Sequence, residues 1–145
     1  MLHPLATWVT QEVSDPEAQR FLQIVFDTIE VWDDLLDRDK EVASADLHRV
    51  FTQLLVDLPL CTFFRRHQDA LVGHMVTAIA AWHASNAMVR GNQEAQAQAY
   101  VLRKEFINLV VLCVALTAGM DKAIAASVRG WQDSAMHDRL KSANL

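Results

Sequence analysis

Apolar residues recur every three or four positions through most of the chain, and no segment alternates convincingly between apolar and polar residues. A repeat near 3.6 residues gives a helix one buried face, whereas a half-buried strand needs strict alternation. The pattern therefore predicts an all-α protein. The chain has 145 residues and no Ser-, Gly- or Pro-rich linker, so we expect a single helical domain over residues 1–145.

Turn and cap residues divide the chain into five predicted helices. Asp15 or Ser14 caps the first, and Pro16 occupies its first position. Its apolar side chains share one face that we expect to be buried: Phe21, Ile24, Val25, Ile29, Trp32, Leu35 and Leu36. The first predicted helix spans residues 16 to about 39, and the second is capped by Ser44 or Asp46 and ended by Pro59. The others span about 62 to 90, about 93 to 118, and about 121 onward.

The fourth predicted helix is apolar on all sides between residues 106 and 116. A helix with this composition is typically surrounded by others. We therefore expect a compact bundle of about five helices around a buried fourth helix. The apolar run of residues 106–118 is shorter than the roughly 20 residues that cross a bilayer, which predicts no membrane span.

Charge and cysteine usage narrow the function classes. Lys and Arg number 13 against 18 Asp and Glu, a net charge of −5 that argues against nucleic-acid binding. Cys61 and Cys113 lie in apolar segments, as free buried thiols do. No export signal is visible at the N-terminus. These features predict a protein of the reducing cytoplasm.

The most unusual feature is an acidic motif with six carboxylates within residues 27–39. At about 100° per residue, four of them share a sector of roughly 80°, with a fifth at its edge. The four are Asp27, Glu30, Asp34 and Asp37, and the fifth is Asp33. Carboxylates one turn apart repel unless a cation bridges them, and Mg²⁺ prefers such hard oxygen ligands together with phosphate oxygens. The motif thus predicts a Mg²⁺ and diphosphate site.

A second interpretation of the acidic motif is a solvated helix face. On the helical wheel, the apolar face centres near Trp32 and Phe21, and the carboxylates lie almost opposite. That arrangement is typical of a surface helix. The sequence leaves both interpretations open.

The run from Asp33 to Asp39 resembles the first aspartate-rich motif, Asp-Asp-x-x-Asp, of class I isoprenoid synthases. The resemblance implies an isoprenoid-synthase-like helical fold in part, with Asp33, Asp34 and Asp37 as ligands of Mg²⁺ that holds a substrate diphosphate. Residues 32–42, 58–59 and 63–65 are also similar to small helical proteins encoded by bacteriophages and prophages.

The chain departs from the synthase pattern in its second metal motif. The nearest counterpart is Asn86, Arg90 and Glu94, which has Arg where a hydroxyl is needed. The chain is also about half the usual length of such a synthase, so a full cavity would require a homodimer or would not exist. A degenerate or repurposed synthase-like fold is therefore the expectation, and whether it is an enzyme stays open.

Two basic pairs are candidate phosphate contacts, provided that they face the acidic motif: Arg65 with Arg66, and Arg103 with Lys104. Two functional hypotheses follow. The first is a small helical protein that binds Mg²⁺ and a diphosphate through the acidic motif. The alternative is a non-enzymatic, phage-encoded interaction protein that dimerises or docks a host or virion protein in the host cytoplasm.

Overall fold

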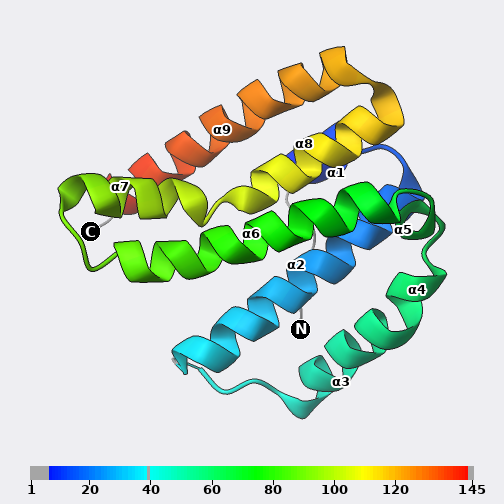
Figure 1. Ribbon diagram of the computed structural model, residues 1–145, viewed down its shortest axis with the longest axis horizontal. Coiled ribbons are helices and arrows are strands. Elements are labelled where there is room, and N and C mark those ends of the chain that lie inside the picture. The colour runs from blue at the N-terminus through cyan, green and yellow to red at the C-terminus, as the bar shows by residue number, and fades with distance from the viewer. Residues whose placement is uncertain (1–6, 39, 144–145) are drawn as a thin grey trace. The chain divides into compact units, whose positions relative to one another are not determined.

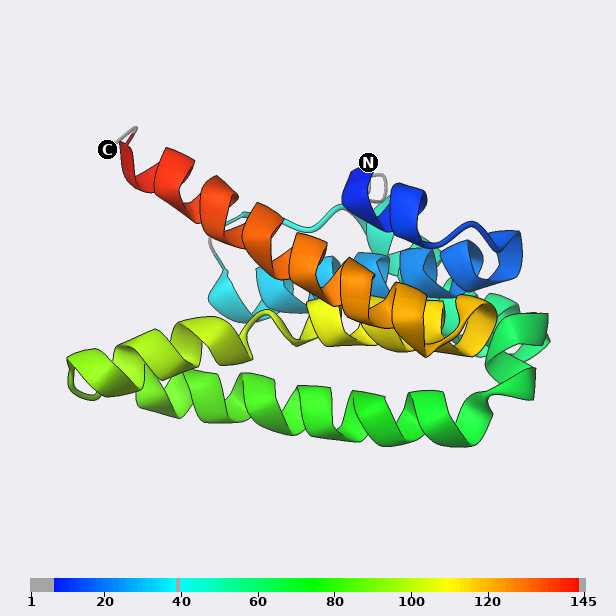
Figure 2. The same ribbon diagram turned by 90° about the horizontal axis from the view of Figure 1, so that it is seen from above.

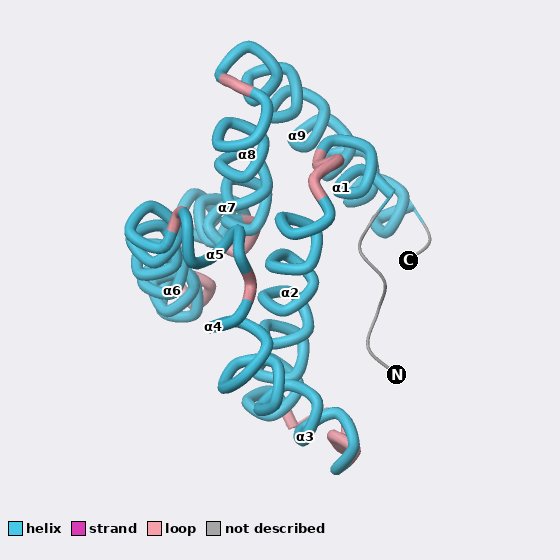
Figure 3. The backbone as a smooth tube through the Cα atoms, turned by 90° about the vertical axis from the view of Figure 1, so that its right-hand side faces the viewer, coloured by secondary structure: helices cyan, strands magenta, loops and turns pink. Residues whose placement is uncertain are grey.

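The computed structural model describes residues 7–38 and 40–143, with side chains through Ser134. Every regular element within these residues is a helix, and they contain no strand (Figure 3). The all-α prediction is confirmed. The chain forms two compact units, residues 1–68 and residues 69–145. A single domain over the whole chain stays a prediction.

Helices α1 (Thr7–Glu12) and α2 (Pro16–Asp37) open unit 1 (Figure 1). Asp15 caps α2, because its carboxylate accepts hydrogen bonds from the backbone N–H groups of Glu17 at 2.8 Å and Ala18 at 3.1 Å. The predicted start of this helix is therefore confirmed, including its proline at the first position.

A helical segment with a widened turn follows α2 in the chain. It consists of α3 (Ser44–Thr52), the π-helical turn η1 (Gln53–Asp57) and α4 (Leu58–Leu60). The prediction that Pro59 ends this helix is wrong. The backbone N–H of Leu58, the first residue of α4, donates to the carbonyl oxygen of Gln53, the first residue of η1. Pro59 then occupies one of the first two positions of α4, where no N–H is required. The segment ends at Cys61, whose backbone is extended.

The core of unit 1 contains three phenylalanine rings. Short helix α5 (Thr62–Arg66) carries Phe63 and Phe64, and both rings pack on Phe21 of α2. The ring centroids lie 5.8 Å and 5.9 Å from that of Phe21, and all three side chains are buried. The predicted single helix over residues 62–90 is wrong, because the chain breaks at His67 before α6 begins.

Unit 2 is built from α6 (Gln68–Met88), α7 (Gln93–Leu102), α8 (Glu105–Ala118) and α9 (Met120–Ala143). The fourth predicted helix, residues 93–118, is interrupted between α7 and α8. No Pro or Gly marks this break in the sequence. Helices α8 and α9 lie side by side and antiparallel (Figures 1 and 2), joined through Gly119 at φ 95°.

Helix α8 buries its apolar residues only in part. The buried ones are Ile107, Leu109, Val110, Cys113 and Val114, while Phe106 is 40% exposed. The arrangement of the other helices around this segment stays a prediction. Within the described residues, no helix has both the length and the apolar character that crossing a bilayer requires.

Candidate functional site

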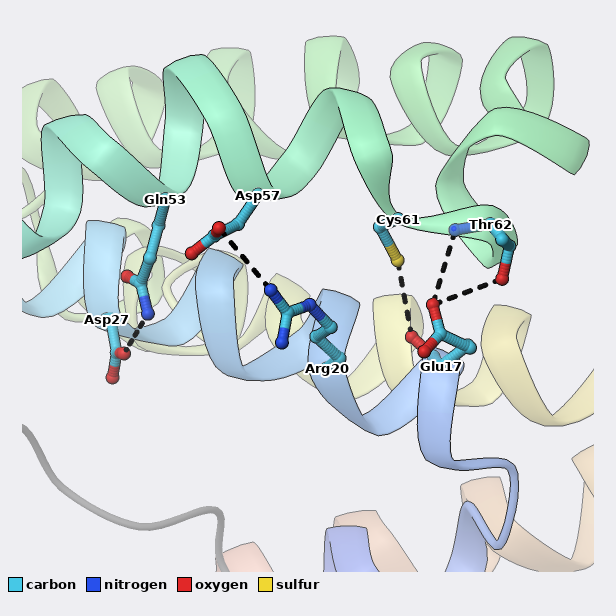
Figure 4. Close-up of polar contacts among 7 residues, drawn as sticks. All are labelled: Glu17, Arg20, Asp27, Gln53, Asp57, Cys61 and Thr62. Atoms are coloured by element: carbon cyan, nitrogen blue, oxygen red, sulfur yellow. Dashed lines mark hydrogen bonds and ion pairs between the residues drawn. The ribbon is translucent and has the colours of Figure 1, made fainter.

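Helix α2 meets the α3–α4 segment and the start of α5 through a row of polar contacts, here called the polar seam (Figure 4). Arg20 Nη2 lies 3.4 Å from Asp57 Oδ1. The N–H and hydroxyl of Thr62 donate to the Glu17 carboxylate at 3.3 Å and 3.1 Å, and the Cys61 thiol donates to the Glu17 carbonyl oxygen at 3.5 Å. Because the side chains of Arg20 and Asp57 are partly exposed, we expect this ion pair to contribute little to stability.

Asp27 belongs to the polar seam and not to an exposed acidic stripe. Its carboxylate accepts hydrogen bonds from the side-chain amides of Gln23 at 2.7 Å and Gln53 at 3.2 Å, and the residue is only 3% exposed. The sequence leaves open which way the acidic residues face, and the structure buries Asp27 beside Gln53, the first residue of η1. Two amide donors satisfy the buried carboxylate, whereas the Gln53 carbonyl oxygen is buried without a hydrogen-bond partner.

Asp33, Asp34 and Asp37 lie in the C-terminal turns of α2. Asp33 and Asp37 are exposed, and Asp34 is half-buried with its Oδ2 3.4 Å from the Lys40 ammonium. The helix ends at Asp37 and not at residue 39, because Arg38 adopts a left-handed conformation with φ 57°. Asp33, Asp34 and Asp37 therefore occupy the last turns of a helix.

The residues predicted to bind Mg²⁺ do not gather into a metal site. In the part of the chain that the structure describes, no group of three or more His, Cys, Asp and Glu side chains could hold a metal ion. Asp27 is occupied by two amides, Asp34 by a lysine, and Glu30 is half-buried. Asp39 lies outside the described residues. Mg²⁺ binding by Asp33, Asp34 and Asp37 stays a prediction.

The first predicted basic pair lies far from the C-terminal end of the acidic motif. Arg65 and Arg66 are exposed in the last turn of α5, directly after the two rings that contact Phe21. Asp37 follows Phe21 by sixteen residues on α2, a separation of about 24 Å along the helix axis. An arginine side chain does not bridge that distance, so this pair does not reach Asp37.

The second predicted basic pair makes contacts within unit 2. Arg103 donates from Nε to Ser85 Oγ at 3.3 Å and from Nη2 to Asn86 Oδ1 at 3.1 Å. Lys104 places its ammonium 3.9 Å from the centroid of the Tyr100 ring. Arg103 therefore ties the break between α7 and α8 to helix α6, a structural role that the sequence pattern does not reveal.

The apolar face of α2 begins in the core and continues onto the surface. Phe21 and Ile24 are buried, whereas Ile29, Trp32 and Leu36 are 48%, 38% and 55% exposed. These three residues, spaced three and four apart, are called the apolar stripe below. The prediction that this whole face is buried is wrong for its C-terminal half.

Sequence reasoning missed the polar partners of α2. The spacing of Gln23 and Asp27 is four residues, a standard helical pairing that could have predicted their hydrogen bond. The contact of Asp27 with Gln53 joins residues 26 positions apart, and no local pattern indicates it.

Comparisons of the chain with family models, curated proteins and solved structures find no match.

Proposed function

We propose that this chain is a non-enzymatic helical protein that acts by binding a protein partner. The observation that carries the proposal is the apolar stripe, three large side chains that continue a buried helix face into solvent. Leu35, beside the stripe, is 48% exposed as well. Large apolar side chains gathered on one face, and not scattered singly, are typical of interaction surfaces.

The first test replaces Leu36 with Asp at the exposed end of the stripe. Affinity capture from cells that make the protein should recover a partner with the wild type and lose it with Leu36→Asp. A buried, uncompensated carboxylate in the interface should weaken binding at least about thirtyfold, or ~2 kcal/mol. Leu55→Asp is the matched control, because Leu55 is 73% exposed on η1 and outside the stripe.

Both variants should keep the helical circular dichroism of the wild type, because substitutions at exposed positions change stability by about 0.5 kcal/mol or less. Light scattering over a range of concentrations separates a second copy of the chain from a different protein. Identical capture by all three proteins, together with a concentration-independent monomer mass, would contradict the proposal.

The Mg²⁺ and diphosphate hypothesis predicts the opposite behaviour in a titration. On the proposed function, calorimetric titration with Mg²⁺ and inorganic diphosphate should give no saturable heat, because the carboxylates do not gather into a metal site. Saturable binding that disappears in an Asp33→Asn, Asp34→Asn variant would instead favour a diphosphate site on α2. The variant keeps the size of both side chains and removes only their charge.

A further inference from the structure

We propose that two copies of the chain pair through helix α6, antiparallel, in a homodimer. This inference goes beyond the proposed function, because it uses a surface of unit 2 and not the apolar stripe of α2. Its basis is an exposed apolar helix face that has Asp69 at its beginning and Arg90 directly beyond its end, with no other Asp, Glu, Lys or Arg between them.

Helices α7 and α8 lie along one side of α6 (Figure 2). His74 Nε2 lies 3.8 Å from Glu105 Oε2 of α8, and Ser85, on the same side of α6, is buried. At about 100° per residue, Val76 and Ala80 point roughly opposite to this side, and both are exposed. Unit 2 therefore covers one side of α6 and leaves the opposite side open.

The residues that point away from α7 and α8 are called the outer face of α6. Its apolar members are Val72, Gly73, Val76, Ala80, Ala84 and Ala87, all of them exposed, and His83 lies among them. The exposed fractions of the two valines are 38% and 62%. An apolar face of this length without charged side chains is typical of an interaction surface.

Gly73 supports a close neighbour on the outer face. It lies within α6, and a Cβ at this position would have no described atom within 4 Å. Packing inside the described chain therefore does not require glycine here. Glycine inside a helix lowers the stability of that helix relative to alanine, and it is useful where another backbone approaches closely. A helix from another molecule would make such an approach.

The charges at the two ends favour a second copy over a different partner. Asp69 and Arg90 are exposed, and their 21-residue separation corresponds to about 31 Å along a helix. When a second α6 is inverted against the first, Asp69 of each copy lies beside Arg90 of the other. The chain has a net charge of −5, but one Asp and one Arg give this face no net charge, so two copies meet here without repulsion.

The same charges select the antiparallel orientation and its register. A parallel pairing would place like charges together at both ends, which reduces affinity. The point midway between Asp69 and Arg90 falls at Ile79 and Ala80, so these side chains lie near their own counterparts across the two-fold axis. Ala87 lies about 22 Å from its counterpart along the helix axis.

Analytical ultracentrifugation of the full chain over a range of concentrations tests the dimer. The wild type should approach twice the 16.3 kDa mass of one chain. Asp69→Arg and Arg90→Asp should each weaken dimerisation at least about tenfold, because each creates two contacts between like charges. The two substitutions together should restore the dissociation constant to within about threefold of the wild type. Asp121→Arg is the matched control, because Asp121 is exposed in the first turn of α9.

Disulfide cross-linking tests the register. Ala80→Cys should give a covalent dimer under mild oxidation, because residue 80 lies near its counterpart. Ala87→Cys should not, because a disulfide joins residues whose Cα atoms are at most about 7 Å apart. The wild type is the control, since Cys61 and Cys113 are buried.

The outcomes separate this inference from the proposed function. A monomer mass at every concentration would overturn the dimer and leave the outer face to a different partner. Wild-type dimerisation in both single charge reversals would overturn the pairing of Asp69 with Arg90, and equal cross-linking of Ala80→Cys and Ala87→Cys would overturn the antiparallel register. Leu36→Asp should keep the dimer, and a monomeric Leu36→Asp would overturn the assignment to α6. Affinity capture of a different protein decides the proposed function independently.

Discussion

Replacing Phe21 with Ala should destabilise the protein by about 3–5 kcal/mol, one of the two largest effects that we expect from a single residue. The Phe21 side chain is fully buried, and its ring lies within 6 Å, centroid to centroid, of both Phe63 (5.8 Å) and Phe64 (5.9 Å). Its removal costs the transfer free energy of the ring and leaves a cavity between α2 and α5. Urea unfolding followed by circular dichroism measures the loss as a lower midpoint.

Phe51→Ala provides the matched control for Phe21→Ala. It removes the same ring from α3, where Phe51 is 59% exposed, so the loss should be about 1 kcal/mol or less. Equal losses for the two variants would mean that the aromatic cluster of α2 and α5 is not the core of unit 1. The comparison tests the packing of this unit independently of any function.

The sequence predicts the start of α2 correctly because the signal is local. Asp15 accepts hydrogen bonds from N–H groups two and three residues later, and a proline follows it at a position that needs no N–H. The helix breaks further on depend on distant contacts. Arg103 precedes the start of α8 and donates hydrogen bonds to Ser85 and Asn86, eighteen and seventeen residues away, and neither Pro nor Gly marks that break.

Pro59 shows a strong local signal that the structure overrides. A proline removes one helical hydrogen bond, which predicts the end of a helix. Here the π-helical turn η1 shifts the hydrogen-bond ladder before the proline, so that the helix continues to Leu60. A pattern of residue types does not reveal such a shift, because the residues of η1 are ordinary helix formers.

The candidate site is half predictable for a related reason. Helical spacing places the carboxylates of α2 relative to one another, and it correctly groups Asp33 with Asp37. It does not reveal which side of α2 another helix covers. Asp27 is buried and accepts a hydrogen bond from Gln53 of η1, whereas Leu36 is 55% exposed. Tertiary packing therefore divides the acidic motif, because Asp27 is buried in a structural contact whereas Asp33 and Asp37 are exposed on the surface.

The Cys113 thiol should react about a thousandfold more slowly in the folded protein than in the unfolded chain at pH 8. Burial on α8 raises its pKa from 9.0 to about 12, because the interior disfavours the thiolate. The thiolate is the reactive form, and its fraction at pH 8 falls from roughly one in ten to roughly one in ten thousand. Iodoacetamide labelling, read by mass spectrometry of the Cys113 peptide with and without guanidinium chloride, measures the ratio. Comparable labelling in both states would contradict the burial of this thiol.

The same raised pKa of Cys113 makes stability fall in alkali. Below about pH 9 the thiol keeps its proton in both states and contributes no pH dependence. Between about pH 9 and 12 only the unfolded chain ionises, so the free energy of unfolding decreases as pH rises. At pH 10 the loss should be about 1.4 kcal/mol. The comparison with Cys113→Ala isolates this effect, because the other groups that titrate there are shared. A difference between the two proteins that stays constant from pH 8 to 10 would mean that Cys113 ionises as readily in the folded protein as in the unfolded chain.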